Sequence, residues 1–348
     1  MATKKARHPF FITWGSWEYW PWYVANLPVF GFVLWFGIRA RNLFFFSAVN
    51  PAIETGGVLG ESKINILNRI PEAVKPKTIF IKKGASLDSL NNLKKAAGID
   101  FPCIAKPNVG ERGFLVSKIE HEQQLEAYLN QSNFDFIIQE YVAAQLELSV
   151  LHYLPPGNNQ GKTTSICKKE FLTVLGDGNA SISELMQKND RAILQLERFE
   201  VEKPDLLKSI PEKGCRVLLE PIGNHCKGTT FLSGNDQIDA SLQKTFDRIM
   251  ERMEGIHYGR FDLRCESWEA LKNGEMKILE FNGIAAEPAH IYDPEIPVIE
   301  KYRVIYRHWK IIFQLYKKQK SLGIKPMTFK EAYNFTRAYF NYKNIAEG

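Results

Sequence analysis

Two short segments constrain this chain more than any other feature, because they place polar ligands inside otherwise apolar strands. Residues 259–264 read Gly-Arg-Phe-Asp-Leu-Arg, and residues 279–283 read Leu-Glu-Phe-Asn-Gly. Successive side chains of a strand point to opposite faces, so Glu280 and Asn282 share one face while Phe281 points into a core. Mg²⁺ prefers carboxylate and amide oxygens, and it usually brings nucleotide phosphates with it. We therefore expect a metal site formed by Asp262, Glu280 and Asn282, with Arg260 beside it.

Length and charge set the class of protein. The 348 residues are enough for two or three subdomains with a large core. The net charge of +6 is concentrated at the two ends. Residues 301–320 contain seven Lys or Arg and no Asp or Glu, and the first 50 residues contain five Lys or Arg and one acidic residue. Both ends are also rich in aromatic residues, which suits an anionic membrane surface; we rank nucleic acid as a partner below it.

The cysteines point to a reducing compartment. The five residues are scattered and odd in number, and none forms a Cys-x-x-Cys pair. This pattern argues against a zinc site or a disulfide framework and fits the cytosol. We expect no cleavable signal peptide, because no small-residue cleavage site follows the first apolar run.

That apolar run covers residues 22–38 and contains Asn26 and Pro28. It is somewhat shorter than the ~20 residues that a spanning helix needs. Trp and Tyr precede it and Arg39 and Arg41 follow it, as at a membrane interface. We favour an interfacial or re-entrant anchor over a buried hairpin or a dimer contact. Deleting residues 1–50 is then expected to release the protein from membranes while leaving ATP binding intact.

From about Gly60 onward, short apolar runs alternate with helical patterns. Period-2 segments predict strands at 78–82, 101–106, 114–119, 136–141, 146–153, 164–174 and 217–220. Helices are predicted at 62–70, 86–97, 122–130, 181–188 and 236–253. Two further helices are expected in the tail, where residues 302–316 form a basic amphipathic pattern and Thr328-x-x-Glu331 is a capping box.

Polar residues upstream of the metal strands suggest a nucleotide site. Lys106 ends an apolar strand, where an ammonium suits phosphate oxygens. The following turn, Asn108-Val-Gly-Glu-Arg-Gly113, would let backbone N–H groups approach a phosphate at Gly110 and Gly113. Residues 137–142, Ile-Ile-Gln-Glu-Tyr-Val, could bond a purine edge, and Glu147 could accept ribose hydroxyls. Taken singly, either Glu is better explained as a surface strand residue.

The order of these residues resembles the ATP-grasp superfamily over roughly residues 60–294, and most of all the D-alanine–D-alanine ligases and the ligase modules of cyanophycin and glutathione synthetases. The resemblance assigns phosphate contacts to Lys63 and Lys106 and a glycine-rich lid to residues 110–114, including Gly110, Arg112 and Gly113. It implies that Glu140, Tyr141 and Val142 form the adenine hinge, that Glu147 binds the ribose, and that Lys169 or its neighbour Lys168 reaches the nucleotide. Arg260 resembles the arginine that stabilises acyl transfer, with Arg264 as a second candidate, and Asp262, Glu280 and Asn282 match the metal triad.

The resemblance implies an α+β ATP-grasp fold, in which two α/β subdomains sandwich ATP. We expect an N-terminal segment at 1–59, the two subdomains at 60–145 and 146–298, and a basic helical tail at 299–348. D-alanine ligases carry an N-terminal α/β domain of their own, which supplies part of the amino-acid site. Here a short aromatic, basic segment takes its place, and we expect an acceptor that arrives at the membrane or belongs to it.

The function implied is a ligase that uses ATP and one or two Mg²⁺ (or Mn²⁺) to join a carboxylate to an amine through an acyl phosphate. Its substrates would be small molecules or lipid-linked groups, and it would act in the cytoplasm at the inner face of the membrane. Two alternatives stay open at this stage: a kinase that phosphorylates a hydroxyl, and a non-catalytic nucleotide-binding membrane adaptor. The oligomeric state is open as well.

Overall fold

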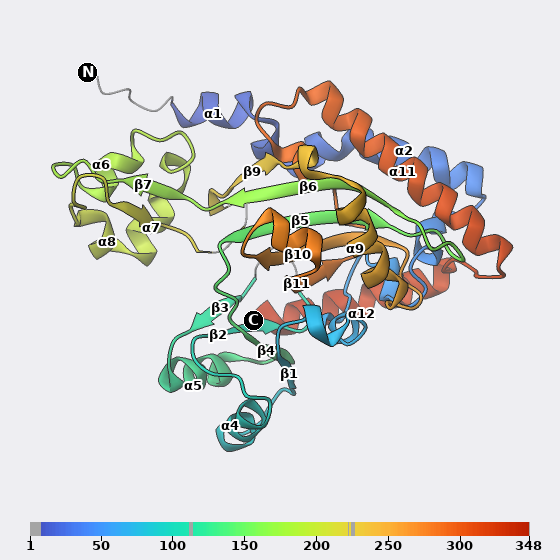
Figure 1. Ribbon diagram of the computed structural model, residues 1–348, viewed down its shortest axis with the longest axis horizontal. Helices are drawn as coiled ribbons and strands as arrows, with labels where there is room; N and C mark the ends of the chain where they lie inside the picture. The colour runs from blue at the N-terminus through green and yellow to red at the C-terminus, as the bar shows by residue number, and fades with distance from the viewer. Residues whose placement is uncertain (1–7, 111–113, 222, 224–226, 348) are drawn as a thin grey trace.

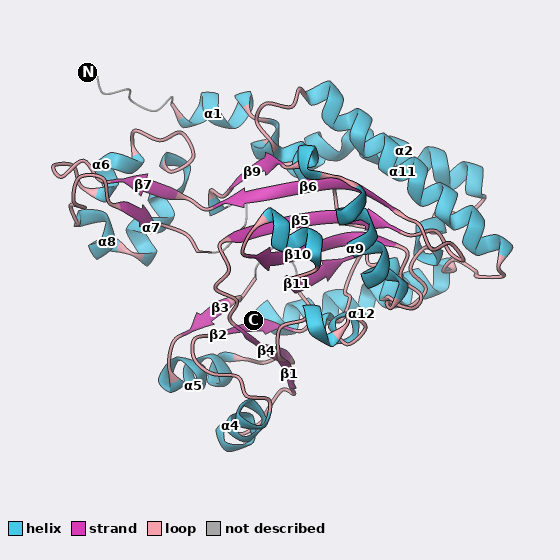
Figure 2. Cartoon of the chain, viewed as in Figure 1, coloured by secondary structure: helices cyan, strands magenta, loops and turns pink. Residues whose placement is uncertain are grey.

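The fold is built from three antiparallel sheets flanked by helices (Figures 1 and 2). The computed structural model describes residues 8–110, 114–221, 223 and 227–347. A four-stranded and a five-stranded sheet meet near the middle of the molecule. A two-stranded sheet lies in a small subdomain to one side. Strands and helices are thus separate rather than alternating in a parallel sheet, which is the α+β class that the sequence predicted.

The four-stranded sheet has the order β1-β4-β2-β3. Its strands are β1 (Thr78–Ile81), β2 (Cys103–Pro107), β3 (Ser117–Ile119) and β4 (Phe136–Glu140). Helices α4 (Leu87–Ala96) and α5 (Glu122–Gln131) cover one face, burying Leu90 and Leu125 against Cys103, Ala105 and Ile138. Because side chains alternate along β2, Lys106 points to the opposite face, which meets the larger sheet.

The five-stranded sheet has the order β11-β10-β5-β6-β9. Its strands are β5 (Leu146–Tyr153), β6 (Lys162–Glu170), β9 (Thr230–Ser233), β10 (Tyr258–Cys265) and β11 (Lys277–Asn282). Helices α9 (Ala240–Glu251) and α10 (Trp268–Asn273) cover one face, where Phe246 packs on Phe261 with ring centroids 5.2 Å apart. Residues 260, 262 and 264 of β10 therefore point to the other face.

The small subdomain interrupts the segment that the sequence predicted as one strand over 164–174. Strand β6 ends at Glu170, and a separate strand β7 (Thr173–Leu175) pairs with β8 (Arg216–Leu218). The chain turns at Leu172, whose carbonyl oxygen accepts from the backbone N–H of Leu219 at 2.9 Å. Helices α6 (Ile182–Met186), α7 (Leu196–Glu202) and α8 (Pro204–Lys208) complete this subdomain. Local pattern did not separate β6 from β7 because only two residues, Phe171 and Leu172, lie between them.

The two ends of the chain pack together. Helix α2 (Trp22–Ala40) lies beside α11 (Val298–Ser321), as Figure 1 shows. The Phe36 and Phe313 rings are 5.2 Å apart, and the hydroxyl of Tyr302 donates to the carbonyl oxygen of Ala25 at 2.9 Å. Helix α1 (Pro9–Gly15) precedes α2, and α12 (Phe329–Glu347) follows α11 and runs back toward the four-stranded sheet. The predicted capping box is confirmed: the Thr328 and Glu331 side chains bond reciprocally to each other's backbone N–H.

The remaining elements are short. Helix α3 (Lys63–Leu67) is capped by Ser62, whose hydroxyl accepts from the N–H of Asn65. Single 3₁₀ turns occur at η1 (Trp17–Tyr19), η2 (Phe45–Ala48), η3 (Glu54–Gly56), η4 (Glu72–Val74), η5 (Ile193–Gln195), η7 (Asn235–Gln237) and η8 (Ala289–Tyr292).

Residues 45–53 belong to the core of the larger sheet rather than to a detachable anchor. Phe45 and Val49 are fully buried with α11, and Ile53 packs in the same core as Phe261. Asn50 is also fully buried: its amide donates to the carbonyl oxygens of Gly56 and Tyr258, and its side-chain oxygen accepts from the N–H groups of residues 257 and 258. Deleting residues 1–50 would remove part of this core, so the expectation that ATP binding survives that deletion is withdrawn.

The predicted boundary between 60–145 and 146–298 separates residues that pack together. Ile66 and Leu67 of α3 are buried on β11 of the larger sheet, although the sequence grouped them with the smaller one. A helix of five residues cannot bury its apolar side chains alone, and the edge strand β11 offers the nearest apolar surface. The domain limits stay a prediction.

Candidate active site

The predicted metal ligands lie side by side on β10 and β11. In the antiparallel register Asp262 is opposite Glu280, and Arg260 is opposite Asn282. The Asn282 amide donates to Asp262 Oδ2 at 3.2 Å, and the Arg260 guanidinium donates to both carboxylate oxygens of Asp262 at 3.1 and 3.2 Å. Three oxygen-bearing side chains and one arginine thus share one face of the sheet.

A β-bulge explains how this face reaches the other sheet. Asp262 pairs with Glu280, but the next residue, Leu263, pairs with Ile278, so Leu279 has no pairing partner on β10. The carbonyl oxygen of Leu279 accepts from the ammonium of Lys106 at 3.0 Å and from the Gln139 amide at 3.4 Å. The extra residue therefore provides a backbone acceptor for two side chains of the smaller sheet.

The two lysines predicted to bind phosphate and the third lysine predicted to reach the nucleotide converge on the same place. Lys106 lies 6% exposed between the sheets, where it also donates to Gln139 at 3.1 Å. Lys63, at the start of α3, forms an ion pair with Glu280 at 3.6 Å and donates to the carbonyl oxygen of Gly110. Lys169 reaches Asp262 at 3.9 Å and Glu147 at 3.1 Å. The three ammonium groups thus face the two acidic metal candidates from three different elements.

The alternation of β6 distinguishes the two lysines that the sequence left open. The side chain of Lys169 is 8% exposed and points to the acidic face, opposite Glu147 in the register. The side chain of Lys168 is 37% exposed and pairs with Glu170. The structure therefore places Lys169 in the site and Lys168 outside it.

Burial and charge perturb these groups in a consistent way. Burial alone would raise the pKa of Asp262, but the nearby charges of Arg260 and Lys169 outweigh it and hold that pKa at about 2. Burial lowers the pKa of Lys106 to about 8, with Glu280 opposing the shift. For Lys169, burial would lower the pKa, but Asp262 and Glu147 outweigh it and raise it. At neutral pH Asp262 is therefore ionised and faces the charged form of Lys106 and Lys169.

The donor set suits Mg²⁺. Within the described residues, no group of three His, Cys, Asp or Glu converges on one point. Here the candidate ligands are two carboxylates and an amide, Asp262, Glu280 and Asn282, on adjacent strands and on one face. Hard divalent cations prefer such oxygen donors. A metal ion bound there would compete with Arg260 and Lys63 for the same oxygens.

The structure places two predicted residues differently from their expected surroundings. Arg264 was a second candidate for stabilising acyl transfer, but its guanidinium pairs with Glu147 at 2.8 Å and donates to the carbonyl oxygen of Val142 at 2.7 Å. Glu147 was expected to accept ribose hydroxyls, but both its oxygens are already engaged, by Arg264 and by Lys169. The register of β5 with β6 and β10 places both cations directly opposite Glu147.

The predicted adenine hinge lies at the edge of this ion-paired group. Tyr141 lies beneath two cations, with Lys118 Nζ 4.6 Å and the Arg264 guanidinium 5.7 Å from its ring centroid. Glu140 caps the strand pair, since its carboxylate accepts from the N–H of Lys77 at 3.1 Å. Gly110 ends the described part of the lid, and Arg112 and Gly113 lie outside the described residues. These assignments remain predictions.

Sequence reasoning missed two residues of the site. The Ser149 hydroxyl donates to Asp262 Oδ1 at 2.5 Å, and Gln139 bridges Lys106 to the bulge carbonyl of Leu279. The signal for Ser149 was its position two residues after Glu147, which puts it on the same strand face. Nothing local marks Gln139, because its partner lies on the other sheet.

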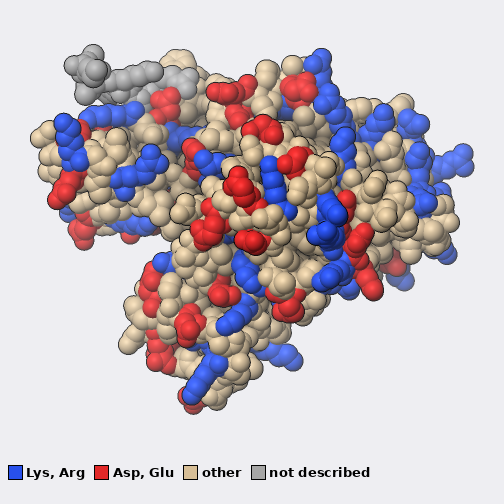
Figure 3. Space-filling model, in the orientation of Figure 1, with Lys and Arg blue, Asp and Glu red and all other residues tan. Residues whose placement is uncertain are grey.

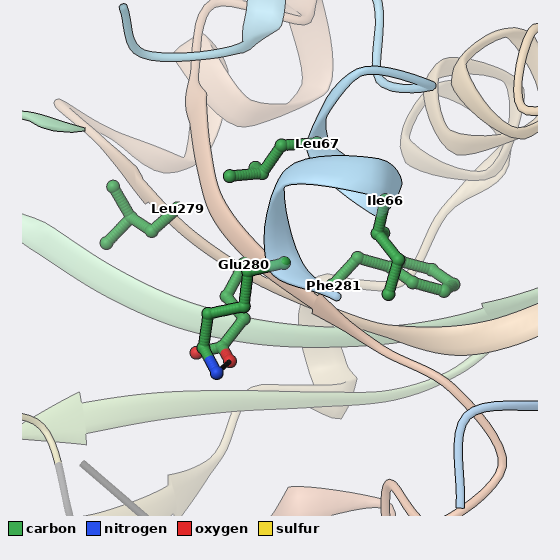
Figure 4. A pocket seen from close by; sticks show the side chains of 6 residues that line it. Ile66, Leu67, Leu279, Glu280 and Phe281 are labelled. Atoms are coloured by element: carbon green, nitrogen blue, oxygen red, sulfur yellow. Dashed lines mark ion pairs between the residues drawn. The ribbon is translucent and has the colours of Figure 1, made fainter. Parts of the chain in front are cut away.

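A small pocket lies between α3 and β11, at the Glu280 end of the site. It has an empty volume of about 170 Å³ and is lined by Lys63, Ile66, Leu67, Leu279, Glu280 and Phe281. Figure 4 shows Glu280 at its polar end, with the dashed line marking the ion pair to Lys63. The Lys106–Leu279 contact joins the two sheets and the Lys63–Glu280 ion pair joins α3 to β11, so a nucleotide bound here would have to displace both.

No family model matches the chain, and a search of the curated proteins found no match. Among solved structures, the chain is similar to a bifunctional glutathione synthetase from Pasteurella multocida (16% identity, TM-score 0.38, covering 70% of this chain and 36% of that one). It is also similar to VanG D-Ala:D-Ser ligase from Enterococcus faecalis (12% identity, TM-score 0.39, 71% and 61%) and to D-alanine–D-alanine ligase from Bacillus anthracis (13% identity, TM-score 0.38, 73% and 68%).

All three are ATP-grasp ligases, the superfamily that the order of residues in the sequence resembles. The chain spans about a third of the first enzyme and about three fifths of the second. With TM-scores below 0.5, these likenesses by themselves decide nothing about activity or substrates. What this chain does has to be inferred from its own site residues.

Proposed function

We propose that this chain is an ATP- and Mg²⁺-dependent ligase that joins a carboxylate to an amine. One observation carries the proposal: Asp262, Glu280 and Asn282 share one strand face with Arg260, and three lysines converge on that face from two sheets and a helix. Counting the neighbouring Glu147 and Arg264, five cationic side chains lie around three carboxylates, an excess that structural ion pairs alone would not need. A polyphosphate between the sheets supplies the missing negative charge.

The reaction would proceed in two displacements. A carboxylate oxygen of the first substrate attacks the γ-phosphorus of ATP, and the bond to the bridging oxygen breaks to release ADP. The amine nitrogen of the second substrate then attacks the acyl carbon, and the carbon–oxygen bond to phosphate breaks as the amide forms. Such transfers need positioning and charge neutralisation more than covalent help from the protein.

The cationic residues would bind different parts of the reacting groups, according to their positions. Lys106 and Lys63, which reach across from the smaller sheet and from α3, would bind phosphate oxygens. Mg²⁺ held by Asp262, Glu280 and Asn282 would neutralise charge on the transferred phosphoryl group. Arg260 would then be free to turn from Asp262 toward the acyl phosphate and the oxyanion. Arg264 is better placed to hold Glu147 and the hinge carbonyl of Val142 than to touch the reacting atoms.

We also propose that the reaction takes place at the cytoplasmic face of a membrane, with substrates that are small or lipid-linked. Support for this comes from α2, the single helix in the described part of the chain that is long and apolar enough to cross a membrane. Only 22% of its apolar window is buried, so it is not a core helix.

The test is turnover of Mg·ATP by the full chain with pools of amino acids, dipeptides and lipid-linked acceptors, followed by mass spectrometry. The expected product has the mass of a carboxylate and an amine minus water. Asp262→Asn and Glu280→Gln should each lower turnover by roughly a hundredfold or more, while the exposed Asp236→Asn should not.

Other outcomes would overturn the proposal in distinct ways. A product that carries phosphate would identify a kinase. Tight ATP binding without turnover on any pool would identify a nucleotide-binding adaptor. Full activity in Asp262→Asn would show that the metal assignment is wrong.

A further inference from the structure

Helix α2 presents an uncovered apolar face. Tyr23, Leu27, Phe30, Leu34 and Ile38 recur at steps of three and four residues and are exposed by 50–70%. We refer to these five residues as the outer face of α2. The neighbouring Trp22 and Trp35 are also more than half exposed. Because each of the five large side chains is at least half exposed, the described residues leave this face largely uncovered.

The opposite face of α2 is equally apolar but is covered. Ala25, Phe36 and Ala40 are buried, and Phe32 and Phe36 contact the ring of Tyr306 on α11, with centroids 5.3 and 5.7 Å apart. A helix that is apolar on all sides is normally buried or in contact with lipid. Since α11 covers one half of α2, the other half requires an apolar partner of its own.

Basic residues border the outer face along its length. On α11 the exposed positions include Arg303, Arg307, Lys310 and Lys317, at helical spacing. Glu300, at the start of α11, pairs with the two arginines at 3.2 and 3.5 Å, so the four cations exceed this one carboxylate. The Arg39 guanidinium lies 5.7 Å and the Lys317 ammonium 5.4 Å from the ring centroid of Phe313, at the C-terminal end of α2. Figure 3 shows Lys and Arg side chains following this part of the molecule. The border thus carries positive charge around an apolar centre.

We propose that α2 docks in the plane of an anionic lipid surface, with its outer face among the acyl chains and the bordering Arg and Lys at the headgroups. This inference rests on the membrane placement proposed above and specifies how it is achieved. Tryptophan and tyrosine next to an apolar stripe are typical of the membrane interface. Amphipathic elements of this kind bind through apolar burial combined with attraction to anionic lipid.

A second copy of the chain fits this surface less well. A two-fold contact places the same patch of both copies face to face. Arg39 and the basic positions of α11 would then meet their own equivalents, with Glu300 as the one acidic residue from 300 to 320 to offset them. An anionic lipid surface offers the opposite charge at that border.

The position of α11 alongside α2 is evidence against a membrane-spanning orientation of α2. The 19 residues of α2 extend about 28 Å, close to the ~30 Å thickness of a hydrocarbon core. However, Tyr302 bonds to Ala25 near one end of α2, and Tyr316 bonds to Ala40 at the other, so α11 accompanies α2 for most of its length. If α2 crossed the bilayer, Arg307 and Lys310 would be carried into hydrocarbon.

The first experiment measures co-sedimentation of the full chain with vesicles of phosphatidylcholine alone or mixed with phosphatidylglycerol. We expect binding that rises with the anionic lipid and weakens with salt. A variant with Leu27→Gln, Phe30→Gln and Leu34→Gln should lose affinity roughly tenfold or more. The matched control replaces three exposed apolar residues of the small subdomain, Val201→Gln, Ile210→Gln and Leu218→Gln, and should bind like the unmodified protein.

The second experiment tests orientation, with the exposed Cys215 replaced by Ser. One cysteine is introduced before α2, as Gly15→Cys at the end of α1, and another just after α2, as Leu43→Cys. A membrane-impermeant maleimide is then added outside sealed vesicles. Labelling of both above the parent background is expected for an in-plane helix. Protection of one of them would show that α2 spans the bilayer and would overturn the inference.

The remaining outcomes separate this inference from the proposals on which it depends. Vesicle binding that the triple variant leaves unchanged would show that the protein docks through another surface. No binding to any vesicle would overturn the membrane placement itself, and self-association through α2, lost in the same variant, would then identify a second copy as the partner. Turnover of Mg·ATP, followed in parallel, reports on the ligase proposal independently, because none of the substituted residues lies in the site.

Discussion

Raising the pH should weaken ATP binding through Lys106. Its ammonium is buried between the two sheets, and burial lowers its pKa to about 8. An ordinary lysine has a pKa of ~10.4 and stays charged well above pH 8. If Lys106 binds phosphate oxygens, it does so in its charged form, so the affinity should follow its protonation.

The size of the effect follows from that pKa. With a pKa of 8, about three quarters of Lys106 is charged at pH 7.5 and about 3% at pH 9.5, so the apparent affinity should fall about 25-fold over this window. A lysine of ordinary pKa would give a change of only ~10%. The phosphates of ATP titrate near pH 6 and stay ionised throughout. Lys169, whose pKa is raised, should not contribute.

The assay is titration calorimetry of Mg·ATP binding at constant ionic strength from pH 7.5 to 9.5. Lys106→Arg keeps its charge and should bind with little pH dependence. Lys106→Met should bind weakly at pH 7.5 and show no further loss. A change below about threefold in the unmodified protein, or an undiminished pH slope in Lys106→Met, would refute the assignment of Lys106 to the phosphates.

Two further predictions concern how the N-terminal segment is held. Asn50→Ala removes four hydrogen bonds to the backbone, and of the four groups the carbonyl oxygen of Gly56 keeps a second bond, from the N–H of Ile284. We therefore expect a loss of about 4 kcal/mol of unfolding free energy in denaturant titrations, against less than about 1 kcal/mol for the partly exposed Asn26→Ala. Equal losses would contradict the role given to Asn50. Arg191→Met leaves the buried carboxylate of Glu18 without its cation and should cost about 3–5 kcal/mol at neutral pH, whereas Lys208→Met, from an exposed pair, should be nearly neutral. Burial raises the pKa of Glu18, and removing Arg191 should raise it further in the folded protein. The folded variant then binds a proton at Glu18 more tightly than the unfolded chain does, so its loss of unfolding free energy should shrink as the pH falls. A loss that stays constant with pH would show that packing rather than charge is responsible.

Much of the candidate site could be predicted because it follows from alternation within single strands. Asp262 with Arg260, and Glu280 with Asn282, are two residues apart on their strands, so each pair must share a face. The same rule distinguishes Lys169 from Lys168 once the face of Glu147 is known. The order of these residues was enough to predict the class of fold.

What local pattern did not predict depends on registers between strands. That Arg264 faces Glu147 follows from the pairing of β10 with β5, which brings together residues more than a hundred positions apart. The bulge that exposes the carbonyl oxygen of Leu279 to Lys106 also depends on pairing, and no residue type marks it. For this reason Ser149 and Gln139 were missed, and Glu147 was expected to be available for ribose.

The N-terminal segment shows the same division. Its sequence alone determined an apolar, aromatic segment with basic residues beside it, because these are properties of composition and spacing. Only the tertiary structure decided that the next residues, from Phe45 to Ile53, are core, and that α11 covers one face of α2 and leaves the other open. Helix propensity and hydrophobicity act within a segment, whereas which of two apolar faces is covered depends on a helix that lies more than 250 residues away in the chain.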